Sequence, residues 1–207
     1  MITGATSGIG RAAAQAFAEA GAKVAFCGLR GDWGAEVEKA AAAAGGRAKF
    51  IPADVRAPAD MERLVDAAEA AFGPLAIAVN NAGISHPPSR LAGIPPKTFT
   101  DVIATNLSGV FHAMRAEIAR MAPRCEGCVI NIASLLAERS SGWMAAYAAS
   151  KAGVVSLTRT AAEDYRASGI RIYSISPHAI ATPLFDQALR DIGGDPAKYA
   201  GGLPKGG

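Results

Sequence analysis

Tyr147 and Lys151 stand four residues apart, and Ser134 lies thirteen residues before the tyrosine at the end of an apolar run. On a helix, residues at this spacing share one face, so the phenol and the ammonium would be neighbours. The positive charge would then favour the phenolate and lower the tyrosine pKa, which would give an acid/base pair suited to carbonyl chemistry. Ordinary surface helices contain the same spacing by chance, so other motifs have to decide between the two interpretations.

A glycine-rich segment near the N-terminus, residues 3–10, leads directly into the alanine-rich stretch 11–20. Glycines before a helix N-terminus let the backbone approach a pyrophosphate, whose charge the free N–H groups and the helix dipole then stabilise. The spacing is TGxxxGxG and differs from the more familiar GxGxxG. This segment predicts a dinucleotide site, and an ordinary glycine-rich turn is the alternative.

Helical and strand-like stretches alternate along the chain, which predicts an α/β fold with a doubly wound, Rossmann-like parallel sheet and helices on both faces. The expected strands are 23–28, 48–52, 75–80, 128–133 and 170–175, and the expected helices are 11–20, 33–44, 59–72, 97–121, 144–168 and 183–190. The candidate residues fall just after strands or on the helices that follow them. In such sheets that edge is where ligands bind.

The four motifs together resemble the classical short-chain dehydrogenases/reductases over nearly the whole chain. The motifs are the glycine-rich segment, Asn80-Asn81-Ala82-Gly83, Ser134 and the Tyr147/Lys151 pair. The resemblance implies an NAD(P)-dependent oxidoreductase that acts on a secondary alcohol or ketone.

The two ends of the chain depart from the family pattern. Only Met1 and Ile2 precede the glycine-rich turn, where the family has a complete first strand, and the chain ends at residues 203–207, before the family's last helix and last strand. We therefore expect residues 1–207 to form a single dinucleotide-binding domain that lacks these parts, as a truncated copy or a fragment. A genuinely shorter family member is the alternative.

The resemblance assigns catalysis to Asn106, Ser134, Tyr147 and Lys151. Tyr147 would exchange a proton with the substrate oxygen while a hydride moves to or from the nicotinamide, and Ser134 would hydrogen-bond the same oxygen. Lys151 would lower the tyrosine pKa and bind the nicotinamide ribose. Asn106, within the long helix, would hold a water that links Lys151 to solvent.

The resemblance also implies a set of cofactor-binding residues. They are Gly4, Ser7, Gly8, Ile9 and Gly10 at the phosphates, Asp54 and Val55 at the adenine, Asn80, Ala82 and Gly83 along the wall of the site, and Tyr147, Lys151, Pro177, Ile180 and Thr182 beside the nicotinamide. Asp54 could instead be a solvated loop carboxylate or a helix cap, and residues 80–83 an ordinary turn. His178 replaces a family glycine, which could crowd the cofactor, strain the backbone or supply an extra base.

The choice between NAD and NADP depends on the segment after the strand 23–28. Gly28 stands where NAD enzymes of this kind usually place an acid, whereas Arg30 could pair with a 2′-phosphate. We therefore expect a preference for NADP, with a solvated loop arginine as the alternative.

Composition excludes several other classes of protein. The 21 Lys and Arg residues against 18 Asp and Glu give a scattered net charge of +3, so no nucleic-acid partner is indicated. The apolar stretches are strand-sized or interrupted by charge, so we expect neither a membrane span nor export but a cytoplasmic protein. Cys125 and Cys128 have the CxxC spacing, but a strand follows them and further metal ligands are missing, so we interpret them as part of a turn and expect no metal site.

The expected partners are a small alcohol or ketone and further copies of the chain in a dimer or tetramer. Two other functions compete. A lyase on the same scaffold would usually lose the glycine-rich turn and replace the lysine by arginine, and this chain keeps both motifs. A non-catalytic cofactor-binding or assembly protein stays open because of the chain ends and His178.

Overall fold

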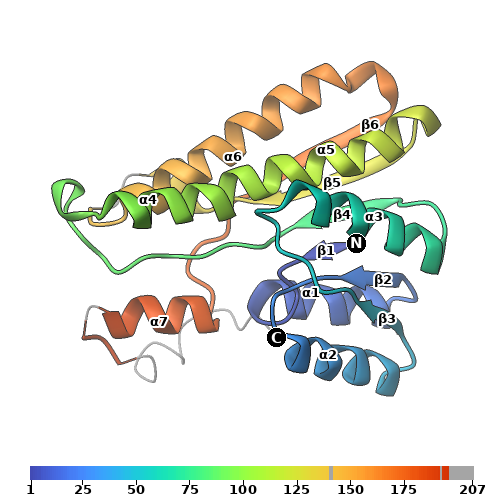
Figure 1. The fold of residues 1–207 in the computed structure, drawn as a ribbon, viewed down its shortest axis with the longest axis horizontal. Helices are drawn as coiled ribbons and strands as arrows, with labels where there is room; N and C mark the ends of the chain where they lie inside the picture. The colour runs from blue at the N-terminus through green and yellow to red at the C-terminus, as the bar shows by residue number, and fades with distance from the viewer. Residues whose placement is uncertain (140–141, 192, 196–207) are drawn as a thin grey trace.

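The computed structural model describes residues 1–139, 142–191 and 193–195. A parallel sheet of six strands in the order β3-β2-β1-β4-β5-β6 forms its centre (Figure 1). The strands are β1 (Ile2–Thr3), β2 (Lys23–Phe26), β3 (Arg47–Phe50), β4 (Ile77–Asn80), β5 (Gly127–Ile132) and β6 (Ile170–Ile175). This is the strand order of doubly wound dinucleotide-binding sheets, so the predicted fold class is confirmed.

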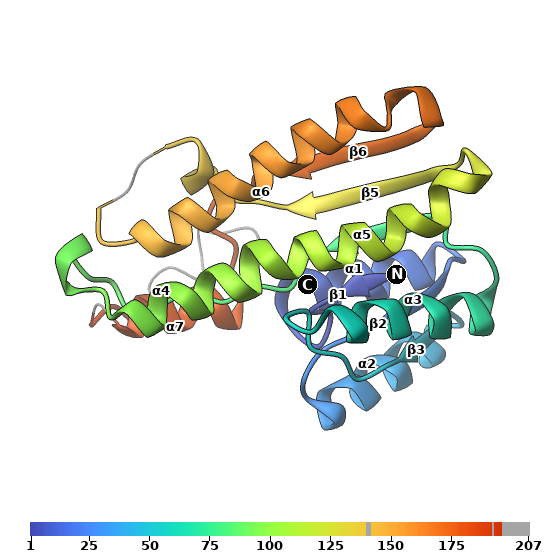
Figure 2. The same cartoon turned by 45° about the horizontal axis from the view of Figure 1, so that its top comes forward.

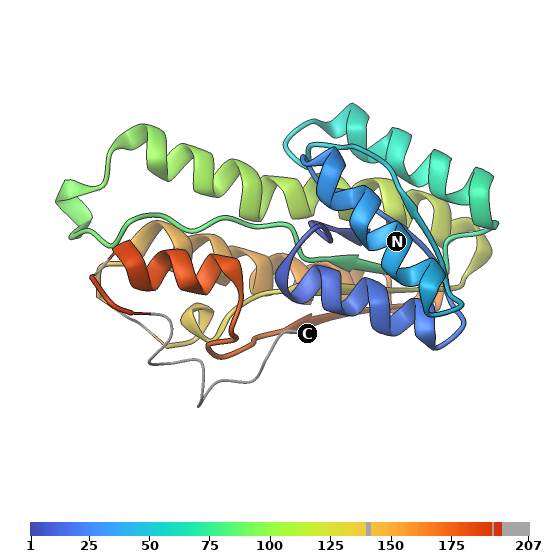
Figure 3. The same ribbon diagram turned by 90° about the horizontal axis from the view of Figure 1, so that it is seen from below.

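Seven α-helices within the described residues surround this sheet. They are α1 (Gly8–Glu19), α2 (Gly31–Ala43), α3 (Pro58–Phe72), α4 (Pro96–Ile103), α5 (Gly109–Met121), α6 (Ala145–Asp164) and α7 (Pro183–Asp191). Helices α3, α5 and α6 cover one face of the sheet, and α1 and α2 cover the other (Figures 2 and 3). None of the helices in this part of the chain combines the length and the apolar character needed to cross a membrane.

Two apolar clusters hold the layers together. Met61, Leu64 and Val129 belong to the larger cluster, between the sheet and helices α3, α5 and α6. Phe26 and Val37 belong to the smaller one, on the side of α1 and α2. The inner strands β2, β4 and β5 bury consecutive residues on both faces, as a parallel sheet covered on both sides requires, whereas the edge strands β3 and β6 alternate with exposed residues.

The long helix expected over 97–121 is interrupted. A five-residue π-helical segment, Ala104–Ser108, lies between α4 and α5 and carries the buried Asn106. Wider turns of this kind inside α-helices are frequent at functional sites, because they redirect a side chain without ending the helix. The extent of the predicted helix is therefore correct, whereas its internal regularity is not.

Strand β1 is the shortest in the sheet. It pairs with β2 only through Ile2 and with β4 through Ile2 and Thr3, so a groove of about 360 Å³ separates the first halves of β2 and β4. The Met1 ammonium lies in this groove and donates a hydrogen bond to the Ile77 carbonyl oxygen, 2.7 Å away. Burial lowers the pKa of this amine to about 6, although the nearby Glu117 carboxylate opposes the change. The segment 203–207 named above lies outside the described residues.

The CxxC motif runs from the turn after α5 into the start of β5. Cys125 has a left-handed backbone with φ of 53°, and Cys128 lies in β5. Neither forms a disulfide, and Cys27 is also free. The interpretation of this motif as a turn is confirmed.

Candidate active site

A cavity of about 770 Å³ opens at the carboxyl edge of the sheet, where the polar residues singled out in the sequence meet. Its lining includes Ile9, Asn81, Gly83, Ser134, Tyr147, Lys151, Pro177, His178, Ile180 and Thr182. Helix α7 and the start of α6 form the outer wall of this cavity. The parallel sheet thus brings together segments that are far apart in the sequence.

Tyr147 and Lys151 occupy successive turns of α6. Tyr147 and Ser134, which follows β5, both line the cavity, and the serine side chain interacts with the tyrosine hydroxyl. The Lys151 ammonium lies 5.8 Å from the centroid of the tyrosine ring and donates a hydrogen bond to the Ile132 carbonyl oxygen at 2.7 Å. The three side chains predicted to share one site therefore do so.

The pKa of Tyr147 differs from the expectation. Burial raises the pKa of this tyrosine above its ordinary value, and the interaction with the Ser134 side chain offsets part of the rise. Burial also lowers the pKa of Lys151 to about 8, because the side chain is only 3% exposed. The prediction that Lys151 brings the tyrosine pKa below its ordinary value is wrong for this structure, since desolvation is the larger effect.

Asn106 fastens the loop that follows Gly83. Its Oδ1 accepts a hydrogen bond from the Ile84 N–H at 2.8 Å, and its Nδ2 donates to the Ile84 carbonyl oxygen and to Ser150 Oγ. A Cβ at Gly83 would lie 3.3 Å from Asn106 Oδ1 and 3.5 Å from Lys151 Nζ, so Gly83 fits between these two groups. These hydrogen bonds of Asn106 therefore hold the loop after Gly83 in place beside Lys151.

The glycine-rich turn fits a dinucleotide phosphate. Gly4 has φ of 64°, and a Cβ there would lie 2.6 Å from Ala82 Cα, while a Cβ at Gly10 would lie 2.4 Å from Asn81 Nδ2. Ser7 precedes α1 without capping it, and no acidic residue occupies the first turn of this helix. The helix N-terminus therefore keeps its N–H groups and its positive dipole for an anion.

The two neighbouring asparagines after β4 have different positions. Asn80 is buried and donates hydrogen bonds to Glu117 and Asn131, so its side chain holds the strand end and is directed away from the cavity. The position of the Asn80 side chain therefore does not agree with the prediction that this residue contacts the cofactor. Asn81, which the prediction omitted, lines the cavity and donates to the carbonyl oxygens of Thr3 and Gly4.

The segment after β2 has no room for an acid at position 28. A Cβ on Gly28 would lie 2.6 Å from Thr6 Cγ2 and 2.9 Å from Thr6 Oγ1, so the threonine fills that space. Arg30 is exposed, and its guanidinium lies over the Trp33 ring at 4.1 Å from the centroid. This cation–π contact holds the arginine at the edge of the sheet.

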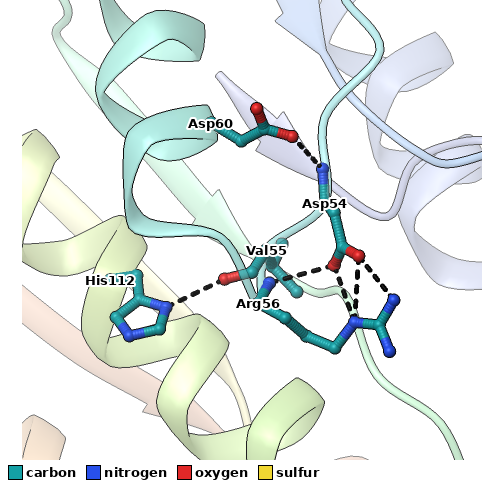
Figure 4. A network of polar contacts seen from close by, with 5 residues as sticks. All are labelled: Asp54, Val55, Arg56, Asp60 and His112. Atoms are coloured by element: carbon teal, nitrogen blue, oxygen red, sulfur yellow. Dashed lines mark hydrogen bonds and ion pairs between the residues drawn. The ribbon is translucent and has the colours of Figure 1, made fainter.

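Asp54 and Val55 follow β3 and belong to a polar network (Figure 4). Both carboxylate oxygens of Asp54 accept hydrogen bonds from Arg56, which holds the pKa of Asp54 below its ordinary value. The Asp54 N–H donates to Asp60, and the Val55 carbonyl oxygen contacts the His112 ring at 3.1 Å. The Asp54 carboxylate is therefore engaged by Arg56 in this structure.

The loop after β6 reaches the cavity with Pro177, Ile180 and Thr182, as predicted. His178 does not have a left-handed backbone, so the strain expected from replacing a glycine is absent at this residue. Its Nδ1 accepts a hydrogen bond from the Ala179 N–H at 2.7 Å, which requires an unprotonated nitrogen. Thr182 also packs against the glycine-rich turn at Gly8.

Several apolar residues of the cavity were not predicted. They are Leu135, Leu136, Trp143, Met144, Leu184, Phe185 and Leu189. Hydrophobic side chains in a sequence usually indicate core, so nothing distinguished these residues from buried ones before the loops were placed.

Comparison with known proteins identifies the family. The sequence model of the family "short chain dehydrogenase" matches residues 1–192. The chain belongs to this family. It is 37% identical over 192 residues to cis-4-hydroxycyclohexanecarboxylate dehydrogenase of Sinomonas cyclohexanicum, a match that covers 93% of this chain and 77% of the relative.

Solved structures of short-chain dehydrogenases agree. The crystal structure of levodione reductase superimposes with a TM-score of 0.92 and 34% identity, covering 96% of this chain and 78% of that one. NAD+-bound xylitol dehydrogenase has a TM-score of 0.84 and 30% identity, and the match covers 86% of this chain and 69% of that one. This short-chain dehydrogenase is therefore an NAD(P)-dependent oxidoreductase of alcohols and ketones.

Proposed function

We propose that the protein interconverts a secondary alcohol and its ketone with Tyr147 as the acid and base. The observation that supports this most directly is the placement of Tyr147 and Ser134 together at the wall of the cavity, with Lys151 one turn further along the same helix. The relatives are named for ring alcohols, a ring diketone and a polyol, all of which carry or yield such a hydroxyl group.

Each residue has a defined part in this proposal. Tyr147 donates its hydroxyl proton to the carbonyl oxygen during reduction and takes it back during oxidation, and Ser134 hydrogen-bonds the same oxygen. The raised pKa of Tyr147 keeps its proton in place at neutral pH, as reduction requires. The bound nicotinamide supplies or accepts the hydride. Lys151 binds the nicotinamide ribose from its position beside Tyr147. Asn106 holds the loop after Gly83 in place beside Lys151.

The cofactor is held along the carboxyl edge of the sheet. Gly4, Ser7, Gly8, Ile9 and Gly10 contact its phosphates, Asp54 and Val55 its adenine, Ala82 and Gly83 its central part, and Pro177, Ile180 and Thr182 its nicotinamide. The uncapped N-terminus of α1 and the glycines that admit no Cβ support this arrangement.

Replacement of Tyr147 by Phe tests the catalytic proposal. The variant keeps the ring but loses the transferable proton, so turnover should fall about a hundredfold or more while cofactor affinity stays nearly unchanged. Turnover is followed by nicotinamide absorbance, and affinity by titration. Activity above about a tenth of the parent value would contradict the mechanism.

We further propose that the protein prefers NADP. Thr6 fills the space in which an acid at position 28 would hold the ribose hydroxyls, and the stacked guanidinium of Arg30 is free to pair with a 2′-phosphate. Arg30→Ala should weaken NADP binding far more than NAD binding. Equal losses for both cofactors in paired titrations would show that the arginine does not contact the 2′-phosphate.

The proposal includes a cytoplasmic homo-oligomer. A reducing compartment agrees with three cysteines that form no disulfide. Phe99 on α4 and Phe111 on α5 are about half exposed, which supports a dimer through these long helices, alone or within a tetramer. Light scattering of Phe111→Glu beside the parent chain measures this contact.

A further inference from the structure

The part of the cavity beyond Tyr147 and Ser134 is apolar. Leu135 and Met144 contribute to its wall near the start of α6, and Leu184, Phe185 and Leu189 contribute from α7. Ser85 and Pro88 belong to the loop that completes it. A substrate placed with its oxygen at Tyr147 would therefore have hydrocarbon around most of its body.

The walls of this cavity carry few charged side chains. Lys151 is the one residue of formal charge among the described lining residues, and its ammonium already donates to the Ile132 carbonyl oxygen. The Nδ1 of His178 accepts a hydrogen bond from the Ala179 N–H. A carboxylate placed against the wall formed by α7 would lose its hydration without a cationic side chain in that wall, which is strongly unfavourable.

Trp143 has unusual geometry for a residue of this wall. Its φ of 72° is left-handed, a conformation that a bulky residue rarely adopts without a compensating reason. Its carbonyl oxygen accepts a hydrogen bond from the Ser89 N–H at 2.9 Å, and its ring lies 5.5 Å from the Arg90 guanidinium. The side chain nevertheless stays 55% exposed while lining the cavity. The loop thus holds a large apolar surface open at the entrance of the substrate region.

We propose that the substrate is an uncharged alcohol or ketone with an apolar, ring-sized body, and that Trp143 is a specificity-determining residue that packs against that body. This inference rests on the proposed function, because it takes the reacting oxygen to lie at Tyr147 and Ser134. It excludes hydroxy acids and polyols as preferred substrates.

Three alcohols test the substrate class. cis-4-Methylcyclohexanol, cis-4-hydroxycyclohexanecarboxylate and xylitol are supplied with NADP+ and with NAD+, and binding to the enzyme in the presence of each cofactor is measured by calorimetry. The first two differ only by a methyl group in place of a carboxylate. We expect kcat/KM and affinity for the methyl compound to exceed those for the other two by about a hundredfold or more.

The possible outcomes distinguish a failure of the proposed substrate class from a failure of the proposed catalysis. Preferential binding of the methyl compound without any turnover would support the apolar site and contradict the proposed catalysis. Equal or better binding or turnover of the carboxylate or of xylitol would overturn the apolar class. Absence of binding by all three alcohols would overturn it as well.

Substitutions at Trp143 test whether this side chain packs against the body of the substrate. Trp143→Gly removes the ring but tolerates the left-handed backbone, and Trp143→Phe keeps an aromatic surface. The glycine variant should raise KM, or the dissociation constant, for the methyl compound about tenfold or more with kcat and cofactor affinity nearly unchanged, and the phenylalanine variant should restore most of the loss. Leu91→Ala, at an exposed apolar residue of the neighbouring loop between β4 and α4 and outside the cavity lining, is the control.

Folding of the Trp143 variants is checked by thermal unfolding. An unchanged KM or dissociation constant in a folded Trp143→Gly variant would overturn the role of the tryptophan. The same loss in Leu91→Ala would also overturn it, because the effect would then not require a side chain that lines the cavity.

Discussion

At the scale of single residues, the contact between Thr6 and position 28 restricts how the cofactor preference can be changed. We predict that Gly28→Asp alone lowers the free energy of unfolding by about 1–3 kcal/mol, because its Cβ would overlap the Thr6 side chain. Combining it with Thr6→Ala should restore part of the stability and shift binding from NADP toward NAD. Denaturant unfolding and paired cofactor titrations measure both effects, and a fully stable Gly28→Asp variant would contradict the prediction.

Glu117 is a second residue with a measurable consequence. It is fully buried, and burial raises its pKa to about 7, while its hydrogen bond from Asn80 opposes the rise. Its Oε1 and Asn80 Oδ1 have no hydrogen-bond partner among the described residues. A protonated carboxyl supplies a donor that an ionised one lacks, so the folded state favours the neutral form.

The pH dependence of stability follows from this shift. Because the folded-state pKa lies above the ordinary value of 4.5, the folded protein binds more protons than the unfolded chain between about pH 4.5 and 7, and the contribution of Glu117 to stability is lost as the pH rises through that range. Glu117→Gln should therefore gain stability relative to the parent by on the order of 3 kcal/mol more at pH 8 than at pH 4.5. Urea unfolding at the two pH values measures the difference.

Glu62→Gln is the control for this comparison, since Glu62 is exposed and paired with Arg115 on the surface. Exposed ion pairs contribute little to stability, so this variant should show almost no pH-dependent gain. The same gain at both pH values in Glu117→Gln would mean that the effect comes from packing and not from the buried charge.

At the scale of elements, the π-helical segment 104–108 connects the helix pair α4 and α5 to the loop that follows Gly83. Asn106→Leu has a similar size but leaves the Ile84 N–H and carbonyl oxygen without their partner, so we expect a loss of about 1–3 kcal/mol in stability. The loop beside Lys151 should loosen, and turnover should fall with it. Thr105→Ala, one residue earlier in the same segment, is the control for a general effect on the helix.

Thermal unfolding and steady-state kinetics give the two readouts for Asn106. If Asn106→Leu keeps both its stability and its turnover, the asparagine does not hold the loop.

The extents of most elements could be predicted from the sequence, and the reason is visible in α3 and β6. Glycine and proline mark the turn after α3, and β6 begins and ends with the isoleucine-rich stretch 170–175. The π-helical turn could not be predicted, because residues 104–108 suit an ordinary α-helix equally well. Packing of the Asn106 side chain against Ile84 and Ser150 distinguishes the two, and both partners are distant in sequence.

At the scale of the whole molecule, the parallel sheet explains why the site could be predicted in outline. Strands that run in the same direction end at one edge, so motifs that follow β1, β4 and β5 must meet there. The contacts between these segments could not be predicted, because they depend on side chains from separate loops. Thr6 beside Gly28 and the left-handed Trp143 are the clearest cases.

The short strand β1 couples the stability of the sheet to the phosphate site. The Ala5 N–H, just after β1, donates a hydrogen bond to the Cys27 carbonyl oxygen at 3.0 Å, so this amide exchanges with solvent only when β1 leaves the sheet. β1 continues directly into the glycine-rich turn, so such an opening also disrupts the phosphate site. We predict that NADPH at a hundred times its dissociation constant slows hydrogen exchange of the Ala5 amide about a hundredfold, as measured by mass spectrometry, whereas exposed loop amides exchange at an unchanged rate. The exchange rate of one amide would then measure how often the cofactor site opens.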